Sequence, residues 1–228
     1  MTREEFKEQL ERFQRDSLKD NRFRVNAADC HPCLNDAEAS HDFCPIYLGH
    51  TFWAMQCLKS SNPASHIDLG GLIYFVGLAS TICPISFYDI RKADIIVPNV
   101  TSYAADFTRL PFETGSVKSI SCLHVLEHIG LGRYGDTLDV TGDLKAAFEL
   151  HRVVASGGQL LLVLPVGRPK VVFNAHRIYS YEQVMDMFSG FELKEFTLVD
   201  PPQYLPHADP ARVKHLNEGA GCFWMVKR

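Results

Sequence analysis

The stretch HVLEHIGLGRYGD, residues 124–136, carries side chains that could do chemistry, because it satisfies two widely used sequence patterns at once. Its first half is an H-x-x-E-H string made by His124, Glu127 and His128. In metalloproteases such a string lies on a long helix, which presents both imidazoles to zinc on one face. Two glycines follow directly here and cut any helix short, so the sequence argues against a protease.

The second half of the stretch is a G-x-G-x-x-G string that begins at Gly130. A dinucleotide-binding loop of this spacing should follow the first strand of a βαβ unit and open a helix directly. Neither condition holds at this place in the chain, so we expect the glycines to shape a loop over the mouth of an active site. Arg133, Tyr134 and Asp136 would then contact the substrate or hold the loop.

Acid–base catalysis is a second use for such residues, because an imidazole titrates near neutral pH and can take a proton from a hydroxyl. The candidate catalytic groups are His124, Glu127, His128 and His176. Asn174 and Arg177, which flank His176, are candidate substrate ligands. Two plainer interpretations stay open: Glu127 and His128 pair to end a turn, or His176 and Arg177 form a packed corner.

A zinc site is an alternative use of the cysteines near the N-terminus. Cys30, Cys33, His41 and Cys44 have a loosely zinc-like spacing. Structural zinc sites usually pair two tight hooks of ligands, whereas the second hook here is only H-x-x-C. We expect most of the seven cysteines to act as small apolar residues.

Alternating strands and helices must position these side chains. Apolar runs predict strands over 65–70, 85–90, 103–105, 117–125, 159–167, 191–199 and 221–228. Helical periodicity predicts helices over 2–18, 45–59, 71–80, 141–158 and 180–190. The fourth helix has Thr141 or Asp143 as its N-cap and Gly157 as its stop, and Ser180 caps the last. Such alternation indicates a mostly parallel sheet with right-handed crossovers.

Polar residues gather where the predicted strands end, and in an open α/β sheet ligands bind at that edge. Asp68 and Gly70 follow the first strand, Asp89 ends the second, and Asp106 follows the third. An acidic residue about 20 positions after the first strand is placed to accept both ribose hydroxyls of a nucleoside cofactor. The sequence therefore predicts a nucleoside site at this edge.

Composition narrows the class of protein. The chain has 228 residues, of which 46% are hydrophobic and 22% charged, with a formal net charge of -4. No basic stripe stands out, so we expect a small-molecule substrate rather than nucleic acid. We also expect no signal peptide and no membrane insertion, and therefore a cytoplasmic protein. The oligomeric state stays open.

Residues 64–228 resemble the class I S-adenosylmethionine-dependent methyltransferases. The resemblance is carried by SHIDLGG, FYDIR, the D-x-x-x-LPF motif from Asp106, the LEH motif from Leu126 and the E-L-x-R-V-x-x-x-GG run from Glu149. The most similar branch is the small-molecule one with ubiquinone-type O-methyltransferase motifs. Within it, IGLGRYGD and FNAHRIY resemble an uncharacterised group, a domain of unknown function, that often appears near surface-polysaccharide functions.

The resemblance implies a three-layer α/β/α Rossmann-like fold of about seven strands, mostly parallel with an antiparallel final strand. It implies S-adenosylmethionine as cofactor, with residues 124–128 beside the substrate. The positions that match cofactor-binding ones are Asp68, Gly70, Gly71, Asp89, Asp106 and Phe107. One departure concerns the family's D-x-G-x-G-x-G motif, in which Leu72 and Tyr74 replace two glycines here.

We therefore expect a helical extension, residues 1–63, packed on a methyltransferase-like domain, residues 64–228. The predicted activity is methyl transfer to a small molecule, such as a sugar or activated-sugar hydroxyl. One alternative is an inactive binding or scaffold protein for polysaccharide assembly. Another is a metal-dependent enzyme, because some ubiquinone-type relatives hold a divalent ion near the positions that match His124, Glu127 and His128.

Overall fold

The computed structural model describes residues 1–19, 25–35 and 43–228, and it separates into two compact units, Met1–Phe43 and Cys44–Arg228. The smaller unit contains helix α1, Arg3–Ser17. A capping box starts this helix, since the Thr2 hydroxyl accepts from the Glu5 amide and the Glu5 carboxylate accepts from the Thr2 amide. The division into residues 1–63 and 64–228 stays a prediction.

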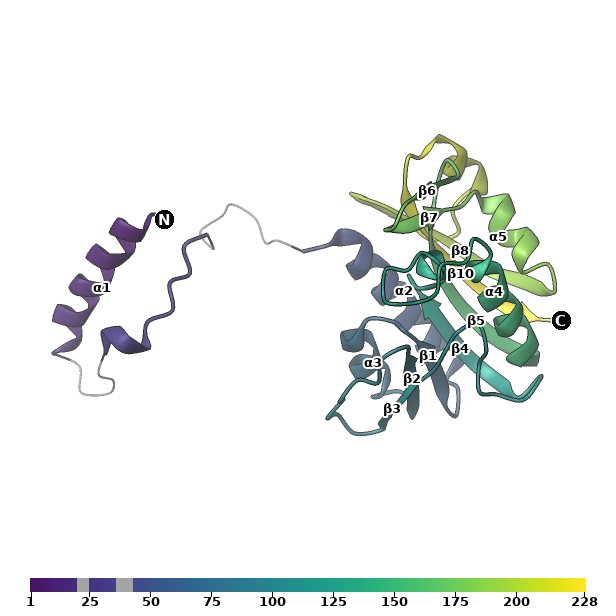
Figure 1. Ribbon diagram of the computed structural model, residues 1–228, viewed down its shortest axis with the longest axis horizontal. Coiled ribbons are helices and arrows are strands. Elements are labelled where there is room, and N and C mark those ends of the chain that lie inside the picture. Colours follow the sequence, from purple (N-terminus) through teal and green to yellow (C-terminus); the bar gives the residue numbers. More distant parts are fainter. Residues whose placement is uncertain (20–24, 36–42) are drawn as a thin grey trace. The chain divides into compact units, whose positions relative to one another are not determined.

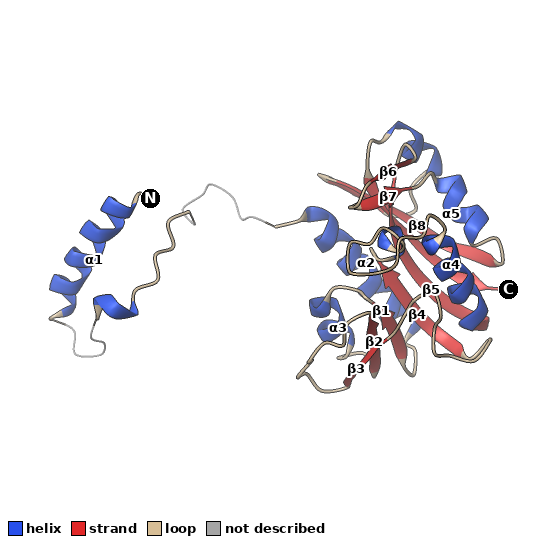
Figure 2. Ribbon diagram, in the orientation of Figure 1, coloured by secondary structure: helices blue, strands red, loops and turns tan. Residues whose placement is uncertain are grey.

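The larger unit is built on one eight-stranded sheet (Figure 2). Its strands, in spatial order, are β3 (Val100–Ala104), β2 (Ile85–Asp89), β1 (His66–Leu69), β4 (Val117–Leu123), β5 (Val154–Val166), β10 (Gly219–Lys227), β8 (Phe191–Asp200) and β9 (Gln203–Leu205). The first five are mutually parallel, and β10 runs antiparallel to both its neighbours. This confirms the expected α/β fold with a largely parallel sheet and an antiparallel final strand.

Helices cover both faces of the sheet (Figure 1). They are α2 (Pro45–Ser61), α3 (Ile73–Ala79), α4 (Gly142–Val153) and α5 (Tyr181–Met187). Side chains alternate along β5, so that Leu160, Leu162 and Leu164 pack with α4 and α5 while Leu161 and Val163 pack with α2 and α3. The result is two apolar cores, one on each side of a central sheet.

Two local expectations about α4 are wrong. The helix ends at Val153 rather than running to Gly157, because Val154 is already extended and pairs with Val117 on β4. Gly157 instead lies within β5 with a φ of 74°. Thr141 does hold the N-cap position, but its hydroxyl donates to Asp139 and makes no capping hydrogen bond.

Other segments differ from or match the sequence expectations in smaller ways. The short edge strand β9 follows a Pro201–Pro202 turn and was not expected. A separate hairpin of β6 (Lys170–Val172) and β7 (His176–Ile178) occupies the loop after β5.

The predicted cap of α5 is confirmed, since Ser180 and Gln183 form a reciprocal capping box. Among the described residues, no helix is long and apolar enough to cross a bilayer.

Helix α2 is part of the larger unit's core, which can be tested at Trp53. This side chain is buried, and its indole N–H donates to Glu195 on β8 over 3.1 Å. We expect Trp53→Phe to lower the free energy of unfolding by about 1–3 kcal/mol, because the half-buried Glu195 carboxylate loses one of two donors, keeping only the Thr197 hydroxyl, and the buried side chain becomes smaller. Urea denaturation measures the change. Leu48→Ala on the exposed side of α2 is the control and should stay within about 0.5 kcal/mol of the parent.

Candidate active site

A cleft opens at the carboxyl ends of β1, β2, β3 and β4. Its lining residues are Gly70, Asp89, Ile90, Arg91, Ala105, Asp106, Phe107, His124, Val125, His128, Ile129, Tyr134 and Asp136. The structure thus brings together residues that the sequence picked out separately after four different strands. Of the predicted site residues, those outside the lining are Asp68, Gly71, Glu127, Arg133, Asn174, His176 and Arg177.

Two aspartates in the cleft each engage one carboxylate oxygen in a local turn. Asp89 Oδ1 accepts from the amide of Arg91 over 2.9 Å. Asp106 Oδ1 accepts from the amide and the hydroxyl of Thr108, over 2.8 and 2.7 Å. Neither Oδ2 atom has a hydrogen-bond donor among the described residues. Both carboxylates can therefore accept from hydroxyl or amino groups of a ligand.

Gly70 lets the backbone come close to the cleft. Its φ is 60°, a conformation that favours glycine, and a Cβ here would lie 3.1 Å from Val125 and 3.2 Å from Phe107. The two residues that replace family glycines behave differently. Leu72 has an ordinary φ of -64° at the start of α3, Tyr74 is 81% exposed, and neither lines the cleft.

Asp68 lies beneath the cleft and is fully buried. Its Oδ2 accepts from the Gly71 amide over 3.0 Å, and its Oδ1 accepts from the Ser121 hydroxyl. Burial raises the pKa of Asp68 to about 7, although both hydrogen bonds oppose that shift. These contacts make Asp68 a support of the loop that follows β1.

The buried Glu127 and the partly buried His124 form a pair at the end of β4. His124 has a φ of 57°, which is uncommon for a residue with a side chain, and its Nδ1 donates to Glu127 Oε1 over 2.7 Å. The remaining polar atoms of the pair, His124 Nε2 and Glu127 Oε2, are buried and have no hydrogen-bond partner among the described residues. The pair therefore has an acceptor on each side that a ligand proton could satisfy.

His128 presents a free nitrogen toward the same region. Its Nδ1 must carry the proton, because it donates to the carbonyl oxygen of Ala175 over 2.6 Å. Burial lowers the pKa of His128 below its usual value, so that the ring is neutral at pH 7 with Nε2 as an acceptor. Tyr134 packs edge-on against the ring, with centroids 5.5 Å apart.

His50 on α2 is a residue that sequence reasoning missed. It is fully buried, and its ring packs edge-on against His124 with centroids 5.0 Å apart. Neither ring nitrogen has a partner among the described residues, and burial lowers the pKa of His50 to about 3. A polar residue within the apolar run of a predicted helix was the only available signal, because its neighbour comes from a distant strand.

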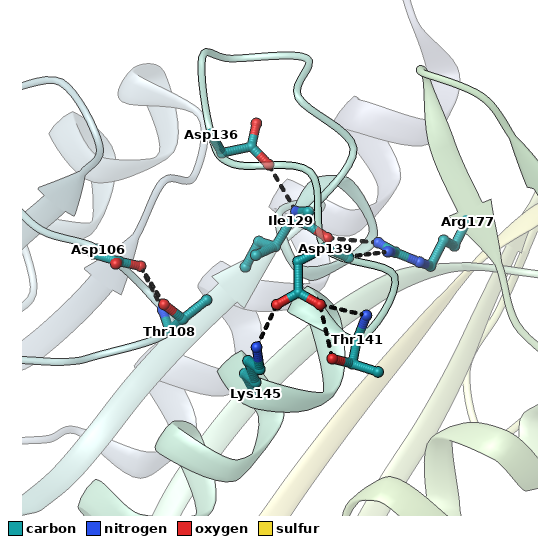
Figure 3. A network of polar contacts seen from close by, with 9 residues as sticks. Asp106, Thr108, Ile129, Asp136, Asp139, Thr141, Lys145 and Arg177 are labelled. Carbon is teal, nitrogen blue, oxygen red and sulfur yellow. Dashed lines mark hydrogen bonds and ion pairs between the residues drawn. The ribbon is translucent and has the colours of Figure 1, made fainter.

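The glycine-rich loop after the Leu126–His128 turn is held by Asp136. Its Oδ2 accepts from the amides of Gly130 and Gly132, over 2.7 and 3.3 Å, and Figure 3 shows the Asp136 carboxylate directed toward the backbone beside Ile129. Burial alone would raise the pKa of Asp136, but these amide hydrogen bonds outweigh it and lower the pKa. The prediction that the glycines shape a loop is confirmed, since α4 begins only at Gly142.

Arg177 anchors the other end of this loop (Figure 3). Its guanidinium donates to the carbonyl oxygen of Ile129 over 2.7 Å and lies 3.6 Å from the Asp143 carboxylate. The side chain is buried and does not line the cleft. These contacts give Arg177 a structural role in positioning the loop.

Three other predicted residues lie at the rim or outside the cleft. His176 Nε2 is 3.1 Å from a Glu218 carboxylate oxygen. Arg133 donates to the carbonyl of Ala175 over 3.1 Å, and its guanidinium lies 5.1 Å from the Tyr134 ring centre. Asn174 is exposed.

The cysteine cluster near the N-terminus is only partly described. Cys30, Cys33 and Cys44 are free thiols, and His41 lies outside the described residues. All seven cysteines fall in the described ranges and none forms a disulfide. Within those ranges, no group of three or more His, Cys, Asp or Glu side chains is arranged to hold a metal ion.

Sequence comparison identifies one family. Residues 99–200, less than half of the chain, match the family described as "Caenorhabditis protein of unknown function, DUF268". No protein with curated annotation matches the chain.

Solved structures share the fold. A putative sarcosine dimethylglycine methyltransferase from Galdieria sulphuraria has a TM-score of 0.55 at 12% identity, covering 79% of this chain and 86% of that one. The N-methyltransferase NodS from Bradyrhizobium japonicum, solved with S-adenosylhomocysteine, has a TM-score of 0.53 at 14% identity, covering 78% and 85%. The 4+2 cyclase SpnF has a TM-score of 0.54 at 14% identity, covering 77% and 80%. At such identities the likeness establishes the fold, which is that of class I S-adenosylmethionine-dependent methyltransferases.

The unsatisfied nitrogens of His50 give a test of whether this residue serves function rather than stability. We expect His50→Leu to raise the free energy of unfolding by about 1–3 kcal/mol, because it removes buried polar atoms that have no partner in residues 1–19, 25–35 and 43–228. Chemical denaturation measures the change, with His151→Leu on α4 as a matched control. A clear loss of stability in His50→Leu would contradict the absence of a hydrogen-bond partner.

Proposed function

We propose that this protein binds S-adenosylmethionine in the cleft and transfers its methyl group to a small-molecule acceptor. The observation that carries the proposal is the convergence of Gly70, Asp89 and Phe107 in one cleft that also contains His124 and His128. The first three come from the ends of neighbouring parallel strands, where a fold of this kind binds nucleosides. The shared fold supports the same reading, although one fold hosts many activities.

The residues of the cleft fit such a cofactor. Asp89, with a free carboxylate oxygen, would accept from the ribose hydroxyls, and Asp106 and Phe107 would lie beside the adenine. Gly70 would let the backbone approach the methionine end, supported from below by Asp68. Because the side chains of Leu72 and Tyr74 do not enter the cleft, the altered glycine motif leaves this region open.

Methyl transfer by direct displacement depends mainly on holding the acceptor in line and excluding water. The cofactor supplies an electrophilic methyl group when it is bound. His128 Nε2 is the favoured acceptor for a hydroxyl proton, since Nδ1 is fixed as a donor to Ala175. His124, oriented by Glu127, is the second candidate base. Tyr134 and Arg133 would contact the acceptor from the glycine-rich loop.

The acceptor is proposed to be a sugar or activated-sugar hydroxyl. This rests on the resemblance of IGLGRYGD and FNAHRIY to a group found near surface-polysaccharide functions. A second candidate function is a binding or scaffold protein that has lost catalysis, and the replacement of two motif glycines by Leu72 and Tyr74 favours it. The two functions differ in whether the cofactor binds.

Isothermal titration with S-adenosylhomocysteine tests the proposal on the full chain. We expect binding in the micromolar range, weakened at least about tenfold in Asp89→Ala, because a charge-assisted hydrogen bond to the ribose is lost. The matched control is Asp94→Ala, an exposed aspartate in the next loop that does not line the cleft. Titration with NAD should give no heat. Folded protein that binds no S-adenosylhomocysteine at high concentration would overturn the methyltransferase proposal.

A further inference from the structure

A chain of hydrogen-bonded side chains crosses the interior of the sheet and ends at the loop after β1. Its members, from β10 to the loop, are Trp224, Gln159, Ser119, His66, Ser121, Asp68 and the Gly71 amide. Each of its side chains is less than a tenth exposed. Polar groups in an apolar sheet are costly unless every one is bonded, so this chain calls for a physical reason.

The donors and acceptors along the chain fix its direction. The Trp224 indole can only donate, and it bonds to the Gln159 carbonyl over 3.0 Å, which turns the Gln159 amide toward Ser119 over 2.8 Å. At the other end, the Ser121 hydroxyl donates to Asp68 Oδ1. Between them, His66 therefore accepts from Ser119 at Nδ1, over 2.7 Å, and donates to Ser121 from Nε2, over 2.9 Å.

The last link reaches the backbone of the loop that opens toward the cleft. Asp68 Oδ2 accepts from the Gly71 amide over 3.0 Å. The two groups are closely packed, since a Cβ at Gly71 would lie 2.6 Å from the same oxygen. Gly70, directly before it, lines the cleft. The position of the carboxylate therefore sets the position of the loop.

We propose that His66 and Ser121 are positioning residues for the Gly70–Gly71 loop, which they hold through Asp68 and couple to the proton of that carboxyl group. When Asp68 is ionised, it accepts from Ser121 and Gly71 together. When it is protonated, its own proton competes for Ser121, and the donors can reverse only from Ser121 through His66 to Ser119, because Trp224 and Gln159 keep their donor roles. Any effect of this coupling on S-adenosylmethionine binding rests on the proposed function. The coupling between the Asp68 proton and the loop does not depend on that function.

The charged and titratable groups around Asp68 agree with this assignment. His66 lies on β1, Ser121 and the buried thiol of Cys122 on β4, and Asp89 on β2. Burial raises the pKa of Asp68 to about 7, and the charge of Asp89 adds to that shift. Burial lowers the pKa of His66 to about 3. Within this hydrogen-bonded series, the group that gains or loses a proton near neutral pH is therefore Asp68 and not His66.

The test follows the Gly71 amide by NMR in the full chain without ligand, between pH 5 and 9. We expect its chemical shift to titrate near pH 7. In Ser121→Ala the midpoint should rise by about one pH unit or more, because the lost hydroxyl favoured the ionised carboxylate. His66→Gln keeps a donor toward Ser121, so its titration midpoint should stay close to that of the parent protein. Ser80→Ala, another buried serine with a local hydrogen bond, should change nothing.

A Gly71 shift that does not titrate, or an identical midpoint in Ser121→Ala and the parent, would overturn the proposal. Should Ser121→Ala fail to fold, Ser121→Cys provides a weaker donor of similar size and should raise the midpoint in the same direction. Titration with S-adenosylhomocysteine across the same pH range then separates the two proposals. If the Gly71 amide shift titrates as expected but S-adenosylhomocysteine does not bind, only the proposed function fails.

Discussion

The register between β1 and its two neighbours is the constraint on which the cleft depends. Leu69 pairs with Tyr88 on β2 and with Cys122 on β4, so three strands leave the sheet at one level. Gly70, Asp89 and the residues after β4 therefore reach the same edge. A slip of a single residue would turn the side chains of a strand to the opposite face of the sheet and dissolve this arrangement.

Buried polar groups on the two sides of that edge differ in how completely they are hydrogen-bonded. Beneath it, His66 has a partner at both ring nitrogens. Above it, and counting partners only within the described part of the chain, His50 has none, and His124 and Glu127 each keep one unsatisfied atom. Saturated groups rigidify a structure, whereas unsatisfied ones cost stability and are retained where a ligand can use them. The contrast distinguishes the hydrogen-bonded groups that support the loop after β1 from the unsatisfied groups at the end of β4 and on α2.

Much of this architecture was predictable from the sequence, because strand patterns and strand-end residues are local signals. The seven main strands overlap the predicted ranges, although β3 begins at Val100 and β5 at Val154, both earlier than predicted. Asp89 ends β2 and Asp106 follows β3, as predicted. Contacts between distant segments were not predictable. Nothing local shows that Arg177 on β7 bonds to the carbonyl of Ile129, or that His50 on α2 packs on His124. Strand β9 was missed because it is three residues long and is defined only by its pairing with β8, which the local sequence does not show.

The base of the glycine-rich loop meets α4 backbone to backbone. A Cβ on Gly130 would overlap the carbonyl oxygen of Asp139, and one on Gly142 would lie 2.9 Å from the Cα of Gly130. Neither glycine can gain a side chain without moving the other segment. At the tip, by contrast, Arg133 and Tyr134 are exposed. The loop thus combines a base that tolerates no added side chain with an exposed tip, whose residues can be replaced while the entry into α4 stays unchanged.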